Sequence, residues 1–289
     1  NTTVNEMVLS DHKEPDCGWD DSLVFRFSPE LFDHIQRAST TLHSMCLTIA
    51  DQAVKDDDLM WRLNIPVSAW DIVRDSWRNA DPLFIGRFDF GIVDGMPKML
   101  EYNADTPEGV IENGLMQNIW AKRLPLASHQ FPSLQHSSII DAAISRAQSP
   151  LISRIVSLLE NMILTGQIWK DGTAFDAYGL GLRHIHVARY PNASRDDTAH
   201  SDLLLSLAKK AAKRANTFPE TVPIETDILT MGISSDGDLL DMTKDHNNSN
   251  NGIPIRSLIR SYPWEMMLAD PGAASLHNSK CRFLSPPWT

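Results

Sequence analysis

Two short segments, residues 84–91 and 99–103, place the strongest constraint on the fold, because polar and apolar side chains alternate in both. Alternation with a period of two is typical of β-strands that have one polar and one apolar face. Asp94-Gly95 lies between the segments and is a common turn sequence of β-hairpins. The pattern therefore predicts a hairpin with these polar positions: Arg87, Asp89, Glu101 and Asn103.

The length of the hairpin loop decides whether the polar residues of the two strands share one face. A loop of only two residues would set the polar side chains of one strand opposite the apolar side chains of the other. A three-residue loop, residues 93–95 with the glycine as a left-handed bulge, pairs Ile92 with Met96 and Arg87 with Glu101. We therefore expect the three-residue loop, which brings all four polar side chains to one surface.

That shared surface would offer the oxygen ligands that hard cations prefer. Asp89 and Glu101 supply carboxylates, Asn103 supplies an amide oxygen, and Mg²⁺ usually completes such a shell with substrate phosphates. Arg87 beside them could hold a phosphate or a carboxylate through two parallel hydrogen bonds. One alternative is an ion pair between Arg87 and Glu101 with two solvated neighbours. A more distant alternative is a hydrolase that uses Asp89 and Glu101 as acid and base.

The sequence that follows the second strand carries the signals of a helix start. Thr106 is predicted to cap the helix, and Pro107 is predicted to be its first residue. Free backbone N–H groups at a helix N-terminus bind anions, so this position would provide a carboxylate or phosphate cradle beside the metal candidates. The simpler interpretation is that Thr106 caps the helix and binds nothing.

Composition narrows the classes of partner. The 289 residues carry 26 Lys and Arg against 37 Asp and Glu, a net charge of −11. This balance argues against nucleic acid and against an anionic membrane surface, because both require a basic face. No apolar run approaches the roughly 18 residues of a membrane helix. Three widely spaced cysteines fit no zinc or redox motif, so we expect free thiols in a reducing, cytoplasmic compartment.

The remaining pattern predicts an α/β protein whose helical N-terminal part leads into the hairpin. Ser28 opens a long helix that reaches Ala50, Ser68 opens a second through Trp77, and a third is expected over 137–164. After Gly172 the pattern changes to a β-α-β unit within a small α/β layer. The elements predicted there are a strand over 183–190, a helix over 202–214 capped by Ser201, a strand over 222–226 and a strand near 255–261.

Three motifs together resemble a known family. They are Arg87-Phe88-Asp89-Phe90, then Glu101-Tyr102-Asn103-Ala104-Asp105-Thr106-Pro107, and much later Tyr262-Pro263-Trp264-Glu265. This combination is similar to the glutathionylspermidine synthase family of ATP-grasp ligases, and the similarity covers nearly the whole chain. It implies an ATP-dependent carboxylate–amine ligase that forms an amide bond through an acyl phosphate. The implied cofactors are Mg²⁺ and ATP, and the implied partners are small peptide-like carboxylates and polyamine-like amines.

The resemblance also assigns roles by position. The residues that match the family's Mg²⁺ ligands, which bridge the ATP phosphates, are Asp89, Glu101 and Asn103. Arg87 matches the arginine that stabilises charge on the acyl phosphate, so Arg87, Asp89 and Glu101 would contact ATP. Thr106 and Glu108 would lie at the acyl-substrate site. Family members usually carry a small residue at the position of Glu108, whose carboxylate would compete with an anionic substrate.

The resemblance finally implies three ranges along the chain. Residues 1–168 would form a helical segment with the site hairpin, 169–272 a Rossmann-like pre-ATP-grasp domain, and 273–289 the start of the ATP-grasp lid region. The ATP-grasp fold would then be incomplete, with the metal and acyl-phosphate half of the site present without most of the nucleotide half. The alternative from another class is a non-catalytic relative that binds a peptide or polyamine.

Overall fold

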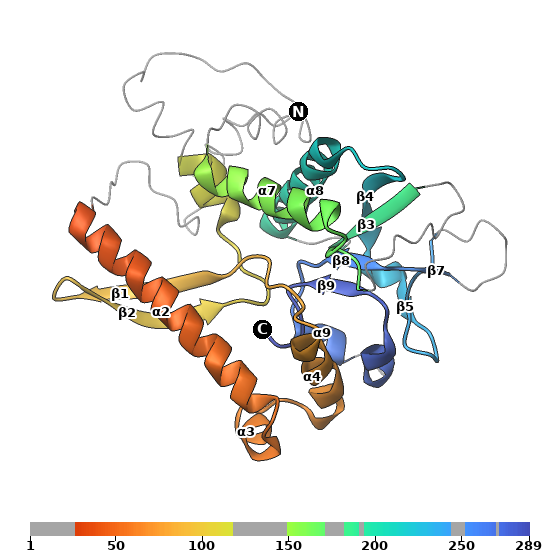
Figure 1. The fold of residues 1–289 in the computed structure, drawn as a ribbon, viewed down its shortest axis with the longest axis horizontal. Helices are drawn as coiled ribbons and strands as arrows, with labels where there is room; N and C mark the ends of the chain where they lie inside the picture. Colours follow the sequence, from red (N-terminus) through yellow and green to blue (C-terminus); the bar gives the residue numbers. More distant parts are fainter. Residues whose placement is uncertain (1–26, 118–148, 171–181, 191–193, 244–251, 270–271) are drawn as a thin grey trace, which may run out of the picture.

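The structure is a computed structural model, and a four-stranded parallel sheet lies at its centre (Figure 1). The residues described are 27–117, 149–170, 182–190, 194–243, 252–269 and 272–289. The strand order is β4 (Glu220–Asp227), β3 (Leu182–Arg189), β8 (Ser257–Ile259) and β9 (Arg282–Leu284). Every neighbouring pair is parallel, so the carboxyl ends of the strands share one edge.

Two long helices cover one face of the sheet, as Figure 1 shows. They are α7 (Pro150–Leu164) and α8 (Arg195–Ala215), whose apolar faces pack on Ile185, Val187 and Leu284 in one core. Capping fixes where each helix begins, because Ser149 and Ser194 accept hydrogen bonds from N–H groups of the first turns.

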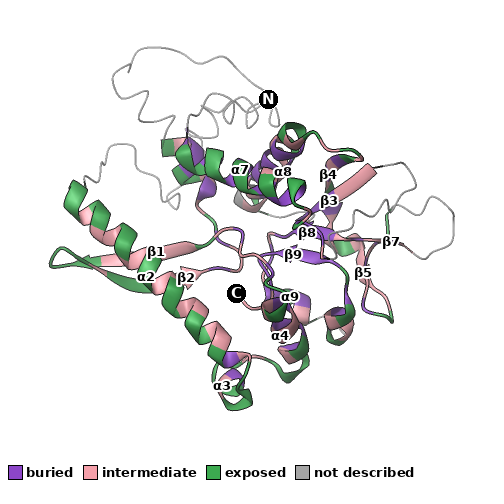
Figure 2. Ribbon diagram, viewed as in Figure 1, coloured by how far each residue is buried: buried purple, intermediate pink, exposed green. Residues whose placement is uncertain are grey.

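Five short helical segments contribute to a second core on the other face of the sheet. They are α3 (Asp57–Arg62), η2 (Val67–Ala69), α4 (Trp70–Arg78), α9 (Trp264–Leu268) and η5 (Ala273–Asn278). Successive residues of a strand point to opposite faces, so each central strand contributes to both cores. The sheet is therefore the middle of three layers, and Figure 2 shows β8 and β9 as buried.

A second, smaller sheet joins the edge of this layer. It is antiparallel, in the order β5 (Met231–Ile233), β6 (Leu239–Asp241) and β7 (Ile253–Pro254), after the 3₁₀ turn η4 (Ile228–Thr230). Leu239 of β6 and Ile255, which directly follows β7, lie in the second core.

The helix α2 (Pro29–Ala53) and the hairpin of β1 (Arg87–Val93) and β2 (Met96–Asn103) extend away from the sheet. Ser28 caps α2 as predicted, because its Oγ accepts a hydrogen bond from the N–H of Leu31 at 3.2 Å. Ala53 is the one buried residue of α2, which is fully described. Figure 2 shows that α2 and the hairpin are largely exposed or half-buried.

The β-α-β unit, the mixed α/β class and the parallel sheet are confirmed, with one correction in the helix. Ser201 does not cap α8, since the helix begins at Arg195 and Ser201 lies inside it, donating to the carbonyl of Asp197. The third predicted helix is confirmed from Pro150 onward, and its expected first residues, 137–148, lie outside the described part.

The predicted ranges along the chain share their cores. Phe84 and Val110 pack with the strand residues of β3 in the first core, across the expected boundary at residue 168. Strand β9 pairs with β8 as an edge of the sheet, so this part of 273–289 belongs to the α/β layer. Leu284 belongs to the first core and Phe283 to the second.

Cys46 and Cys281 are free thiols as expected, while Cys17 lies outside the described residues. Across the described ranges, no helix has both the length and the apolar character that crossing a membrane requires.

Candidate functional site

The hairpin brings all four predicted polar residues to one face, by a different register from the one expected. Val93 pairs with Met96, so the loop has two residues, Asp94 and Gly95, with φ values of 51° and 74°. The three-residue loop and its pairing of Ile92 with Met96 are therefore wrong. A two-residue turn with both φ values positive matches the twist of hairpin strands, which explains why this turn forms.

A bulge in the middle of the hairpin restores the shared polar face. The register shifts between Asp89 and Phe90, and Leu100 is the extra residue on β2, with 73% of its surface exposed. After the shift, Asp89 pairs with Glu101. Arg87 pairs with Asn103 and not, as predicted, with Glu101. Residues directly opposite each other point to the same side, so the polar patch forms as expected.

The other face of the hairpin is aromatic and packs against α2. The rings of Phe88 and Tyr102 stack with centroids 3.9 Å apart and an interplanar angle of 9°. The hydroxyl of Tyr102 lies 2.9 Å from Nδ1 of His43, one of the few polar contacts between α2 and the hairpin. Aromatic stacking and this hydrogen bond therefore hold in place the hairpin that carries the polar patch.

Arg87 and Asp89 form a two-bond ion pair along β1. Nε of Arg87 donates to Oδ1 of Asp89 at 2.8 Å, and Nη2 donates to Oδ2 at 3.0 Å. These hydrogen bonds raise the pKa of Arg87 and lower the pKa of Asp89. The alternative interpretation of an Arg87–Glu101 pair is corrected, since the guanidinium binds its neighbour on the same strand. Glu101 acts on it through charge alone.

Asn103 has both ends of its side-chain amide engaged. Its Oδ1 accepts from the N–H of Thr106 at 3.1 Å, and its Nδ2 donates weakly to the carbonyl of Thr106 at 3.4 Å. The two contacts orient the amide and leave its oxygen one further lone pair for a cation. This local turn also directs the chain away from β2.

Thr106 is not a helix cap, which corrects the sequence prediction. Helical structure begins at Val110, and the described segment η3 (Glu112–Met116) is a π-helix. Gly109, with φ of +92°, precedes it. Asn103 binds the N–H of Thr106, so the expected helix start becomes a loop and the predicted anion cradle at Thr106 does not form.

Glu108 lies near Arg87, as its proposed role requires. Nη1 of Arg87 reaches the backbone carbonyl of Glu108 at 3.4 Å, and the Glu108 carboxylate adds to the raised pKa of Arg87. Three carboxylates, those of Asp89, Glu101 and Glu108, therefore lie around a single guanidinium.

The donor set fits Mg²⁺. Two carboxylates and an amide oxygen on one surface are hard oxygen ligands, and each Asp89 oxygen keeps a lone pair while Arg87 is bound. Asp89, Glu101 and Asn103 would hold the ion, which would supply positive charge for substrate phosphates. Among the described residues, those of the hairpin included, no group of three or more His, Cys, Asp and Glu side chains is placed to bind a metal, so the proposed site depends on the Asn103 amide as well as on the two carboxylates.

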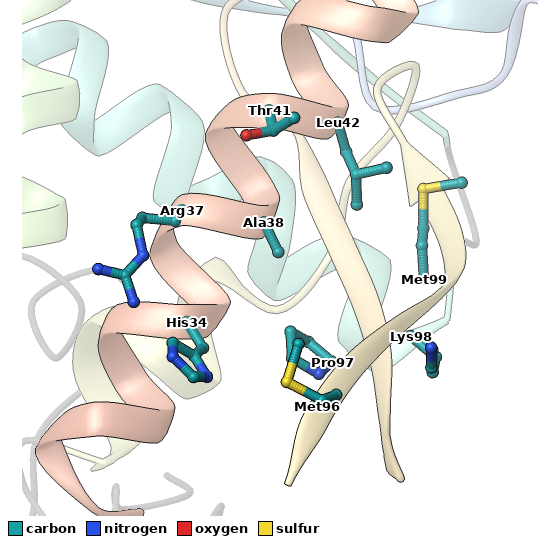
Figure 3. Close-up of a pocket in the computed structure, with 9 residues that line it drawn as sticks. All are labelled: His34, Arg37, Ala38, Thr41, Leu42, Met96, Pro97, Lys98 and Met99. Carbon is teal, nitrogen blue, oxygen red and sulfur yellow. The ribbon is translucent and has the colours of Figure 1, made fainter. Parts of the chain in front are cut away.

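A groove of about 490 Å³ lies between α2 and the tip of β2 (Figure 3). Figure 3 shows His34, Arg37 and Leu42 on the helix side and Met96 to Met99 on the strand side. Met99 pairs with Phe90 and so faces α2, on the side opposite the polar patch. The groove is thus separate from the candidate site.

Sequence reasoning missed the contacts that anchor the site. Asp105, two residues after Asn103, binds the side chain of Arg260 and accepts from the N–H of Trp264 at 2.9 Å. The sequence did mark both residues, since Asp105 and Trp264 each belong to a motif that carries the resemblance to the family. Because the two residues are 159 positions apart, local sequence pattern could not show that they are in contact.

The fold and the site together define an α/β protein with a candidate Mg²⁺ and anion site on a hairpin. The chain belongs to the glutathionylspermidine synthase preATP-grasp family, whose model matches residues 2–289. The predicted family is thereby confirmed.

Similarity to three other proteins supports this membership. A Haemophilus influenzae protein named "Putative acid--amine ligase" is 27% identical over 270 residues, 93% of this chain and 57% of the relative. The "Bifunctional glutathionylspermidine synthetase/amidase" of Escherichia coli is 36% identical over 88 residues, 30% of this chain and 14% of that protein. "Trypanothione synthetase" of Crithidia fasciculata is 33% identical over 89 residues, 30% of this chain and 14% of that protein. This chain thus spans 57% of the Haemophilus influenzae relative.

Proposed function

We infer that the chain is part of an ATP-dependent carboxylate–amine ligase that forms an amide bond through an acyl phosphate. The single observation that carries this proposal is the convergence of Arg87, Asp89, Glu101 and Asn103 on one hairpin face. Family membership and relatives named as ligases and synthetases support the same reaction class. Glutathione and spermidine are taken from the names of the family and of a relative, so the substrates proposed for this chain are a small carboxylate and an amine.

In this proposal the residues of the polar patch have two different roles, which follow from their charges. Asp89, Glu101 and Asn103 hold Mg²⁺, which neutralises the phosphates of bound ATP. Arg87 stabilises negative charge on the carboxylate as it becomes an acyl phosphate. Its permanent positive charge and planar group suit an anion with two oxygens. Asp89 accepts from Nε and Nη2 and the carbonyl of Glu108 accepts from Nη1, which leaves one N–H each of Nη1 and Nη2 for the substrate.

Thr106 and Glu108 are proposed to line the carboxylate site. The Thr106 hydroxyl can donate to a substrate oxygen, while its N–H is already bound to Asn103. The Glu108 carboxylate lies close enough to Arg87 to raise its pKa and would repel an anionic substrate. We therefore propose that Glu108 disfavours carboxylates with further negative charge near the reacting group.

The activity of the whole protein needs a nucleotide site as well. We propose that the described α/β layer acts with an ATP-grasp part and does not bind ATP strongly alone. The ranges 1–168, 169–272 and 273–289 and the cytoplasmic location remain predictions.

An assay of ADP and phosphate release by the full-length protein tests the proposal. Release should require a carboxylate and an amine together, and Arg87→Ala should abolish turnover while binding of Mg²⁺-ATP stays mostly intact. Arg78→Ala is a matched control, because Arg78 also pairs with an aspartate, Asp75, at 2.6 Å but lies on α4. Full turnover in Arg87→Ala would overturn the assignment.

The competing proposal is a non-catalytic module that binds a peptide or polyamine on its acidic surface. Relatives named for ligase activity favour the enzyme. Calorimetry on the full-length protein separates the two, because tight polyamine binding without uptake of Mg²⁺-ATP would support the binding module.

A further inference from the structure

Asp105 leaves the candidate site and reaches the parallel sheet. Its Oδ1 accepts from Nη2 of Arg260, and its Oδ2 accepts from the backbone N–H of Trp264 at 2.9 Å. Both carboxylate oxygens are thus used by residues more than 150 positions later in the chain. Asp105 follows Asn103 by two residues, so this contact fixes the end of the site hairpin.

Arg260 is the fixed partner in this contact. Its side chain is fully buried, and its guanidinium lies 4.3 Å from the centroid of the Trp264 ring. Nε and Nη2 donate to the carbonyl of Ser285 at 3.1 and 2.8 Å, and Nη1 donates to the carbonyl of Tyr262 at 2.6 Å. The indole N–H of Trp264 donates to the same Ser285 carbonyl at 3.2 Å. With these bonds made, Arg260 is not available to a substrate.

The location of these contacts gives them a role. Arg260 directly follows β8 and Ser285 directly follows β9, so both lie at the carboxyl edge of the parallel sheet. Asp105 therefore ties the loop after β2 to the edge where parallel α/β sheets bind ligands.

We propose that Arg260 and Asp105 form a positioning pair that holds the Asn103 end of the hairpin against the sheet. The inference rests on the proposed function for its consequence, since the group positioned is a proposed metal ligand. Neither residue touches a reactant in this proposal. The pair fixes residues 104–106, and the N–H of Thr106 in turn orients the amide oxygen of Asn103.

A second buried arginine–aspartate pair provides a matched control. Arg282, on β9, binds Asp81, and its Nη2 also donates to the carbonyl of Lys170 at 3.3 Å. Asp81 is 5% exposed and contacts no residue of the polar patch. Asn in place of either aspartate removes the charge that faces a buried arginine and keeps the size of the side chain, so the two changes are closely matched.

The experiment compares Asp105→Asn with Asp81→Asn in the full chain, well below the unfolding temperature of each. Binding of Mn²⁺, followed by electron paramagnetic resonance, reports on the metal ligands. Hydrogen exchange of the 101–109 backbone reports on the loop. For Asp105→Asn we expect about tenfold weaker Mn²⁺ binding and about tenfold faster exchange, a change of about 1.4 kcal/mol in each equilibrium. For Asp81→Asn we expect both to stay within twofold of the unsubstituted protein.

Asp105→Glu keeps the charge and covers the case in which Asp105→Asn does not fold. The longer side chain displaces the loop, so loop exchange should rise while the unfolding temperature changes little. Equal loop exchange in the Asp105 and Asp81 variants would overturn the positioning role. If Asp89→Asn leaves Mn²⁺ binding unchanged, the metal assignment under the proposed function fails, and loop exchange alone then decides the role of Arg260 and Asp105.

Discussion

The parallel sheet and the hairpin are held in place by different physical means. In the sheet, Ile185, Val187 and Leu258 are at most 1% exposed and pack between two layers of helices. Strands β1 and β2 are fully described, and none of their residues is buried. The hairpin depends instead on aromatic stacking, a Tyr102–His43 hydrogen bond and the Asp105 anchor. The buried contacts that stabilise the fold are therefore concentrated in the sheet. The residues proposed for catalysis lie on the hairpin, which is held by few contacts.

The largest difference in the free energy of unfolding is expected between replacing a leucine of the core and replacing a leucine of the hairpin. Leu207 of α8 is fully buried, so Leu207→Ala should lower the free energy of unfolding by about 2–5 kcal/mol. Leu100→Ala should change it by no more than about 0.5 kcal/mol, because the bulged side chain is 73% exposed. Urea unfolding measures both. A large cost for Leu100→Ala would mean that the ribbon is packed as tightly as the sheet.

Two arginine–aspartate pairs extend the comparison to pH. Arg87 lowers the pKa of Asp89 on the exposed ribbon. Burial raises the pKa of Asp81 to about 6, against the opposing charges of Arg282 and Lys170. Between the ordinary pKa and 6, the folded protein holds more protons at Asp81 than the unfolded chain. This contribution to stability is therefore full below pH 4 and is lost as the pH rises to 6.

The size of that contribution is about 3 kcal/mol, at about 1.4 kcal/mol for each pKa unit. Denaturant unfolding at a series of pH values should show a decline between pH 4 and 6 that the Asp81→Asn variant lacks. Parallel pH profiles would show that Arg282 keeps Asp81 ionised, and Asp81 would then resemble Asp89.

Local sequence pattern predicted the elements and the composition of the polar face. Alternation placed Arg87, Asp89, Glu101 and Asn103 together because the aromatic face that packs against α2 tolerates no slip of register. The position of the β-bulge could not be predicted from alternation, since a bulge at the turn and a bulge at Leu100 both bring the four polar residues to one face. Turn preference decides between them, and Asp94-Gly95 favours the two-residue loop.

Contacts between distant residues explain what the pattern missed. The Thr106-Pro107 pair predicts a helix start when only neighbouring residues are considered. In the fold, Asn103 binds the N–H of Thr106, and Arg260 with Trp264 binds Asp105. These bonds stabilise a loop in place of the first helical turn. The residues around Arg260, the buried arginine that follows β8, do not indicate that its partner is Asp105.

A smaller effect is expected where the backbone of the ribbon approaches an aromatic ring. A Cβ on Gly86 would lie 2.8 Å from two atoms of Tyr102, whereas a Cβ on Gly91 would meet Leu100 at 3.8 Å. Gly86→Ala should therefore cost about 1–3 kcal/mol through overpacking. Gly91→Ala, its matched control in the same hairpin, should be nearly neutral. Equal unfolding midpoints in urea would show that the Tyr102 ring moves freely, so that stacking does not fix the ribbon.

The smallest effect tests the hydrogen bond between the ribbon and α2. Tyr102→Phe keeps the ring stacked on Phe88 and removes the hydroxyl that contacts His43. A hydrogen bond of this kind contributes about 0.5–1.5 kcal/mol to the free energy of unfolding. A double-mutant cycle with His43→Ala isolates the bond, because both single changes remove the same contact. A coupling energy near zero would leave stacking and the Asp105 anchor to hold the hairpin, and the anchor variants should then disturb the candidate site more strongly.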